Sequence, residues 1–127
     1  MDVTPEQIIE RFKLSWTETQ LFYTNLIDSY EAYDNFIPLL FFLKKIARAG
    51  EDKNFRLGTS MNDLIISRSA EFGLRADQKF VAIQVKNNLF VISLWEGSKL
   101  NKEYRIKDLD DELLKGLLQT LKLEPIN

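Results

Sequence analysis

The chain contains 127 residues, of which 45% are hydrophobic and 28% are charged, and its formal net charge is −2. These values predict one soluble globular domain over residues 1–127 with a core of its own. The basic residues are scattered rather than gathered in a stripe, which argues against nucleic acid as a partner.

Cysteine and histidine are both absent. Their absence excludes disulfides, thiolate nucleophiles, the usual general base near neutral pH and the commonest transition-metal ligand. Carboxylate chemistry, an activated lysine or serine, and oxygen-ligated cations remain open. The sequence carries no phosphate-binding loop, dinucleotide fingerprint or calcium loop. We therefore expect no cofactor and no metal, and a binding protein rather than an enzyme.

No apolar run is long enough to cross a membrane, since the longest, residues 36–43, is interrupted by Pro38. The first residues also lack the basic and apolar regions of a signal peptide. We therefore expect a cytoplasmic protein that does not contact a membrane.

Two helix starts are predicted near the N-terminus. Thr4 precedes Pro5, and Gln7 stands where the partner residue of a capping box belongs, which predicts the first start. A second start is predicted at Ser15 or Thr17, after which apolar residues recur at helical spacing.

A further helix is predicted after Asp34 or Asn35, with Pro38 in its first turn. Apolar residues cover most of its circumference, which places it in the core or against a partner. Gly50 can supply a left-handed cap at its end.

Residues 60–72 permit two interpretations. Ser60 with Asp63 resembles a capping box and Gly73 resembles a helix stop, which favours a helix. The run Leu64-Ile65-Ile66-Ser67 is instead typical of a strand, which would pair beside the strands that follow. Of the two, we favour the helix.

The clearest signal lies between residues 79 and 107, which predict three consecutive antiparallel strands. Asn87 and Asn88 tolerate positive φ and separate two apolar runs of matching length, so they are expected to form a hairpin turn. One sheet face is then uniformly branched or aromatic, with the cross-strand pairs Val81 and Leu94, Ile83 and Ile92, and Val85 and Phe90. The second face is mixed, with the pairs Phe80 and Trp95, Ala82 and Ser93, and Gln84 and Val91.

The register of the third strand depends on whether the second turn contains an even or an odd number of residues. A two-residue turn would oppose Glu103 to Ile92 and place charge on the apolar face. A three-residue turn over residues 97–99 opposes Tyr104 to Ile92 and keeps that face apolar, so we predict the three-residue turn, with a glycine-assisted bulge.

A last helix is predicted after Asp108 or Asp110, with a leucine stripe wide enough to cover one sheet face. The predicted fold class is α+β. It consists of N-terminal helices, a three-stranded antiparallel meander and a C-terminal helix packed on the sheet. The meander has four strands if residues 60–72 form a strand.

Three groups of residues are candidates for a binding site. The second sheet face combines aromatic walls with polar groups, unless a helix covers it: Phe80, Gln84, Ser93, Trp95, Glu103 and Arg105. Three tyrosines beside polar positions are candidates for an exposed aromatic patch: Tyr23, Tyr30 and Tyr33. A weaker anion-binding candidate consists of Ser67, Arg68 and Arg75, the alternative being that both arginines pair with neighbouring carboxylates.

These features favour a non-enzymatic binding protein, such as an adaptor, regulatory or inhibitor-like domain. Its expected partner is a protein, either a different protein or a second copy of the same chain in a homodimer. The alternative is a small-molecule-binding domain or a carboxylate-dependent enzyme that uses Glu103 and Arg105 beside Trp95.

Overall fold

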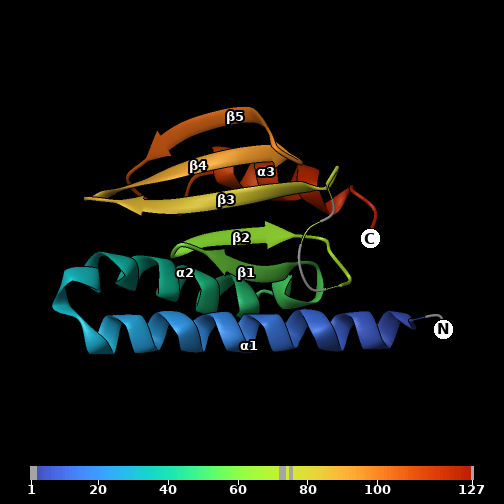
Figure 1. Ribbon diagram of the computed structural model, residues 1–127, viewed down its shortest axis with the longest axis horizontal. Coiled ribbons are helices and arrows are strands. Elements are labelled where there is room, and N and C mark those ends of the chain that lie inside the picture. Colours follow the sequence, from blue (N-terminus) through green and yellow to red (C-terminus); the bar gives the residue numbers. More distant parts are fainter. Residues whose placement is uncertain (1–2, 72–73, 75, 127) are drawn as a thin grey trace.

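The computed structural model describes residues 3–71, 74 and 76–126 (Figure 1). Phe72, Gly73 and Arg75, which entered the predictions above, lie outside the described residues. The helices are α1 (Pro5–Ser29), η1 (Glu31–Phe36), α2 (Ile37–Arg48), η2 (Glu51–Lys53) and α3 (Glu112–Lys122). The strands are β1 (Arg56–Ser60), β2 (Asp63–Ser67), β3 (Lys79–Lys86), β4 (Leu89–Glu96) and β5 (Lys99–Ile106).

The five strands form one antiparallel sheet in the order β1-β2-β3-β4-β5. The α+β class is therefore confirmed, but the sheet has five strands rather than three or four. Every pair predicted for β3 and β4 is present, from Phe80 opposite Trp95 to Lys86 opposite Leu89. Asn87 has a φ of 57° in the turn between them, as a tight hairpin of this kind requires.

The third strand of the predicted meander has the expected register, but its turn is shorter than predicted. Tyr104 lies opposite Ile92, as predicted. The turn, however, consists of residues 97–98 alone. The one extra residue that this register requires lies in a β-bulge of β5 beyond the turn, where the register shifts between Leu94 and Trp95. A bulge adds one residue to one strand, so it corrects the parity as a three-residue turn would.

The prediction of a helix over residues 60–72 is wrong. Residues 56–67 form the hairpin of β1 and β2, whose turn contains Asn62 at a φ of 73°. Pairing of β2 with β3 places Leu64 and Ile66 in the core. The apolar face that these alternate residues share with β3 stabilises the strand more than a capping-box pattern stabilises a helix.

The predicted second helix start at Ser15 or Thr17 is also wrong, because α1 is continuous. The capping box at its beginning is confirmed: the Thr4 amide donates to the Gln7 side chain, and the Gln7 amide donates to the Thr4 hydroxyl. Ser15 lies in mid-helix and its hydroxyl donates to the carbonyl of Phe12 at 2.6 Å. A serine hydroxyl can therefore form its hydrogen bond in the middle of a helix, and a serine does not by itself mark the start of a helix.

The caps of the other two helices differ from prediction. Neither Asp34 nor Asn35 caps α2, which follows directly on η1 with no side-chain cap. The cap of α3 is Asp111, rather than Asp108 or Asp110, and its carboxylate accepts from two backbone amides of the first turn.

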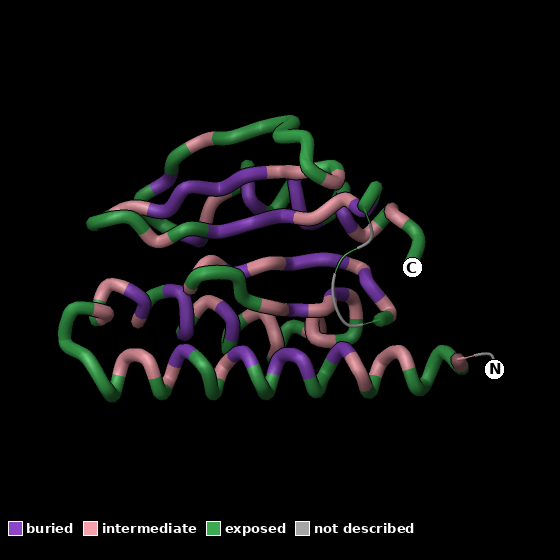
Figure 2. Tube along the Cα trace, viewed as in Figure 1, coloured by how far each residue is buried: buried purple, intermediate pink, exposed green. Residues whose placement is uncertain are grey.

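The helices share one core with one face of the sheet, which we call the covered face (Figure 2). Its buried side chains are Leu57, Leu64, Ile66, Val81, Ile83, Phe90, Ile92 and Ile106. The same core contains Trp16 and Tyr23 of α1, the leucines of α2, and Leu114, Leu117, Leu118 and Leu121 of α3. The prediction that the C-terminal helix packs on the sheet is confirmed, and α3 lies behind the strands in Figure 1.

The long helix α1 occupies the edge of the sheet beside β1 (Figure 1). The hydroxyl of Ser15 accepts the Leu57 amide at 2.9 Å, and the Trp16 indole donates to the carbonyl of Phe55 at 2.8 Å. The first contact satisfies a backbone amide of the edge strand β1, and the second satisfies a backbone carbonyl just before that strand. Unpaired backbone groups at the edge of a sheet are open to pairing with another chain. α1 therefore closes this edge of the sheet.

Candidate functional site

The part of the second sheet face that β3, β4 and β5 form has no helix over it among the described residues. None of its side chains belongs to the core that the helices share with the covered face. We call it the uncovered face, and define it by the residues predicted from the sequence: Phe80, Gln84, Ser93, Trp95, Glu103 and Arg105. The alternative that a helix covers these residues is therefore wrong.

An aromatic pair lies at one end of the uncovered face, where β3 begins and β4 ends. The rings of Phe80 and Trp95 stack with their centroids 6.1 Å apart and their planes within 4° of parallel. The Trp95 indole N–H donates to the Ser93 hydroxyl at 2.9 Å, which fixes the indole on the sheet. Both rings are half-buried, so part of each remains accessible to a partner.

Polar side chains extend the uncovered face along the strands from this aromatic pair. Gln84, Glu103 and Arg105 are all exposed. Glu103 lies opposite Ser93 across the β4–β5 pairing, and Arg105 lies opposite Val91 two residues along. Accessible aromatic rings next to exposed polar side chains are a combination that protein-binding surfaces use.

The three predicted tyrosines do not form one exposed patch. Tyr23 is fully buried, and its hydroxyl donates to the carbonyl of Asn62 at 2.9 Å, so its assignment to an exposed surface is wrong. Burial, assisted by the nearby Asp63 carboxylate, raises the pKa of the Tyr23 phenol above its ordinary value. Tyr30 is 61% exposed and packs edge-on against the half-buried Tyr33.

The predicted anion-binding group is not assembled as an open site. Arg68 donates to the backbone carbonyls of Glu124 and Asn54, each at 2.9 Å. It therefore joins the C-terminal segment to the loop before β1 instead of pairing with a carboxylate. Ser67 is buried in β2, and Arg75 lies outside the described residues.

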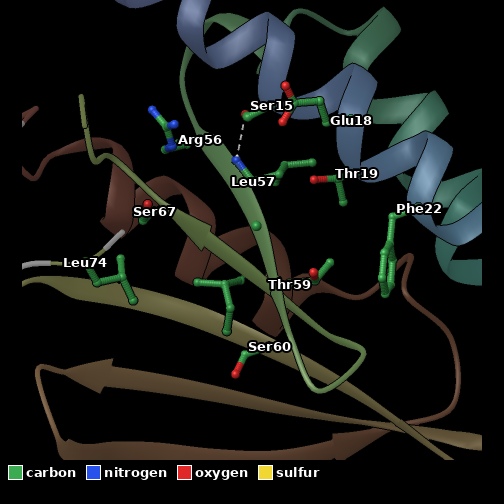
Figure 3. A pocket seen from close by; sticks show the side chains of 12 residues that line it. Ser15, Glu18, Thr19, Phe22, Arg56, Leu57, Thr59, Ser60, Ser67 and Leu74 are labelled. Carbon is green, nitrogen blue, oxygen red and sulfur yellow. Dashed lines mark hydrogen bonds between the residues drawn. The ribbon is translucent and has the colours of Figure 1, made fainter. Parts of the chain in front are cut away.

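Sequence reasoning missed a pocket of about 500 Å³ between α1 and the β1–β2 hairpin (Figure 3). Phe22 of α1, Ile65 of β2 and Leu74 provide apolar walls, and Gly58 of β1 lies between them. Of the residues predicted for a site, only Ser67 lines this pocket. Ser67 lies opposite Phe80 in the sheet, so the pocket adjoins the uncovered face. Because β1 was not predicted as a strand, no pattern in the sequence indicated that these residues lie together.

Two opposite charges line the same pocket, Glu18 on α1 and Arg56 on β1. Burial and the neighbouring Arg11 cation lower the pKa of the Arg56 guanidinium, whereas Glu18 and Glu71 act in the opposite direction. Arg11 has its own counter-ion, since it forms an ion pair with Glu71 at 3.1 Å.

The described residues contain no group of three or more acidic side chains placed to hold a metal ion. Within the same residues, no helix has the length and apolar character needed to cross a membrane. The chain matches no protein-family model, and comparisons with curated proteins and with solved structures found no significant match.

Proposed function

We propose that this chain is a non-enzymatic partner-binding domain whose protein partner contacts the uncovered face. The observation that carries the proposal is the stacked pair of Phe80 and Trp95 on a sheet face that the described helices leave open. Large aromatic side chains contribute much of the free energy of protein association when a partner buries them.

The hydrogen bonds of the uncovered face also favour binding. The Trp95 indole is already held by Ser93, so the ring loses little rotational freedom when a partner docks. The exposed Gln84, Glu103 and Arg105 supply hydrogen-bonding groups on the same face, where they select a complementary surface.

A photo-crosslinking amino acid at Gln84 tests the proposal in the native cell. We expect a discrete adduct with one protein, and we expect its yield to fall when Trp95→Ala is added. An adduct of the chain with a second copy of itself identifies the partner as a homodimer.

The matched control places the same crosslinker at Gln119, which is exposed on α3, away from the uncovered face. If Gln119 gives the same adduct, or if Trp95→Ala leaves the Gln84 adduct unchanged while the protein remains folded, the uncovered face is not the binding surface.

A further inference from the structure

The floor of the pocket between α1 and the β1–β2 hairpin is a glycine that the fold does not require. Gly58 lies in the middle of β1, opposite Ile65. A Cβ atom built on it meets nothing within 4 Å, and its φ is not positive. Glycine weakens the interior of a strand, and it is characteristic of positions where a ligand or another backbone approaches closely. Its effect here is to keep the pocket open.

The walls of this pocket suit a ligand with a large apolar group. Ile65 stands beside Gly58 across the hairpin, and Phe22 faces the same space from α1 (Figure 3). The Phe22 ring is 38% exposed and packs edge-on against the buried Tyr23, which holds it in place. The volume falls in the range of small-molecule pockets, about 300–1,000 Å³.

The charges of the pocket indicate what the polar end of that ligand carries. Within the described residues, the only hydrogen bond of the Arg56 side chain is a long one of 3.4 Å to the carbonyl of Ala70, and no carboxylate lies within ion-pair distance of it. Glu18 is exposed on the helix beside it and also forms no ion pair with the described residues. A cation and an anion line one pocket, and neither is in a direct ion pair among the described residues, so they complement a ligand that bears both signs.

We propose that this pocket binds an α-amino acid with a large apolar side chain. Its carboxylate lies against Arg56, its ammonium group faces Glu18, and its side chain lies over Gly58 between Ile65 and Phe22. A polyanion is disfavoured because Glu18 repels it, and a purely apolar ligand leaves both charges without partners. This proposal goes beyond the partner-binding function, and either can fail without the other.

A titration of the ¹⁵N-labelled protein with L-phenylalanine, followed by NMR, tests the proposal directly. We expect saturable shifts of the amides of Leu57, Gly58 and Thr59. Phenylalaninamide lacks the carboxylate and N-acetylphenylalanine lacks the ammonium charge. Each derivative is expected to bind at least about tenfold more weakly, as the loss of one charged contact implies. If no saturable shift is seen, or if N-acetylphenylalanine binds as tightly as phenylalanine, the proposal is wrong.

Two charge variants test which charged group of the ligand lies against Glu18 and which lies against Arg56. Glu18→Gln should abolish the preference for phenylalanine over its N-acetyl derivative and keep the preference over the amide. Arg56→Gln should do the reverse. The opposite pattern, or equal loss of both preferences in each variant, overturns the proposed orientation.

A substitution that fills the floor of the pocket distinguishes binding in this pocket from binding elsewhere on the protein. Gly58→Val places a branched side chain in the open space above β1, at a position where strand propensity favours it. We expect a folded spectrum and loss of the phenylalanine-induced shifts. Lys102→Val is the matched control, since it adds the same side chain to an exposed position of β5 and should leave the affinity unchanged. A folded Gly58→Val protein that binds phenylalanine normally contradicts the proposal.

Discussion

The two faces of the sheet differ in how far their side chains are buried. On the covered face, cross-strand partners such as Ile83 and Ile92 are fully buried and belong to the core shared with the helices. On the uncovered face, Gln84 and Glu103 are exposed, and the Phe80–Trp95 stack is only half-buried. A uniformly apolar face must be covered to be stable in water, whereas a mixed face tolerates contact with water and remains available for binding.

The largest expected effect compares neighbouring residues on the two faces. Ile92→Ala should lower the free energy of unfolding by about 2–5 kcal/mol, because it opens a cavity in the core. Val91 is also buried, but it lies beside Gln84 and Arg105 of the uncovered face and outside the core shared with the helices, so Val91→Ala should cost about 1.5 kcal/mol, the transfer free energy of two methylene groups. Urea denaturation of both variants measures the difference. Equal losses would mean that the uncovered face is packed as tightly as the core.

A smaller effect is expected where α1 closes the sheet edge. Ser15→Ala leaves the buried Leu57 amide without its 2.9 Å acceptor, which should cost about 1–3 kcal/mol. Hydrogen exchange should show faster exchange of the Leu57 amide than in the parent protein. Thr17→Ala is the control, because the Thr17 hydroxyl donates only within its own exposed helix surface. If Leu57 exchanges at the parent rate in Ser15→Ala, the serine does not close the edge.

Two tyrosines of the core should respond differently to the same substitution. The buried Tyr23 hydroxyl donates to the Asn62 carbonyl, so Tyr23→Phe should cost about 1 kcal/mol. The Tyr104 hydroxyl is also buried, but has no hydrogen-bond partner among the described residues. Tyr104→Phe should therefore leave the free energy of unfolding unchanged or raise it slightly. Thermal denaturation of both variants compares them, and equal destabilisation would contradict the assignment.

The same tyrosines predict a loss of stability in alkaline solution. Burial raises the pKa of the Tyr23 phenol, and burial together with Asp111 raises the pKa of Tyr104 to about 12. An unfolded tyrosine releases its proton near pH ~10, so above that pH the unfolded chain binds fewer protons than the folded one. The free energy of unfolding should then fall as the pH rises.

For Tyr23, the slope of this fall should reach about 1.4 kcal/mol per pH unit while the folded phenol keeps its proton. Tyr23→Phe should remove that contribution, as urea titrations on either side of pH ~10 can measure. A parent protein whose stability does not change over this range would show that the folded phenol ionises normally.

Local patterns in the sequence predicted the best-defined parts of the fold. The Asn87-Asn88 turn and the matching apolar runs were sufficient for the complete β3–β4 register and for the uncovered face with Phe80 and Trp95. These features depend on the alternation of side chains within a strand, which is a local property. The capping box of Thr4 and Gln7 is local in the same sense.

What the sequence determined by itself was the alternation of apolar side chains, the tight turn and the first helix cap, because each depends on residues close together in the chain. Only the tertiary structure decided that residues 60–72 contribute a strand, since pairing with β3 supplies the stabilising contacts. It also decided that Tyr23 is buried and that Glu18, Gly58 and Arg56 line one pocket. These outcomes depend on where α1 packs against β1, and contacts between residues about forty positions apart leave no local pattern.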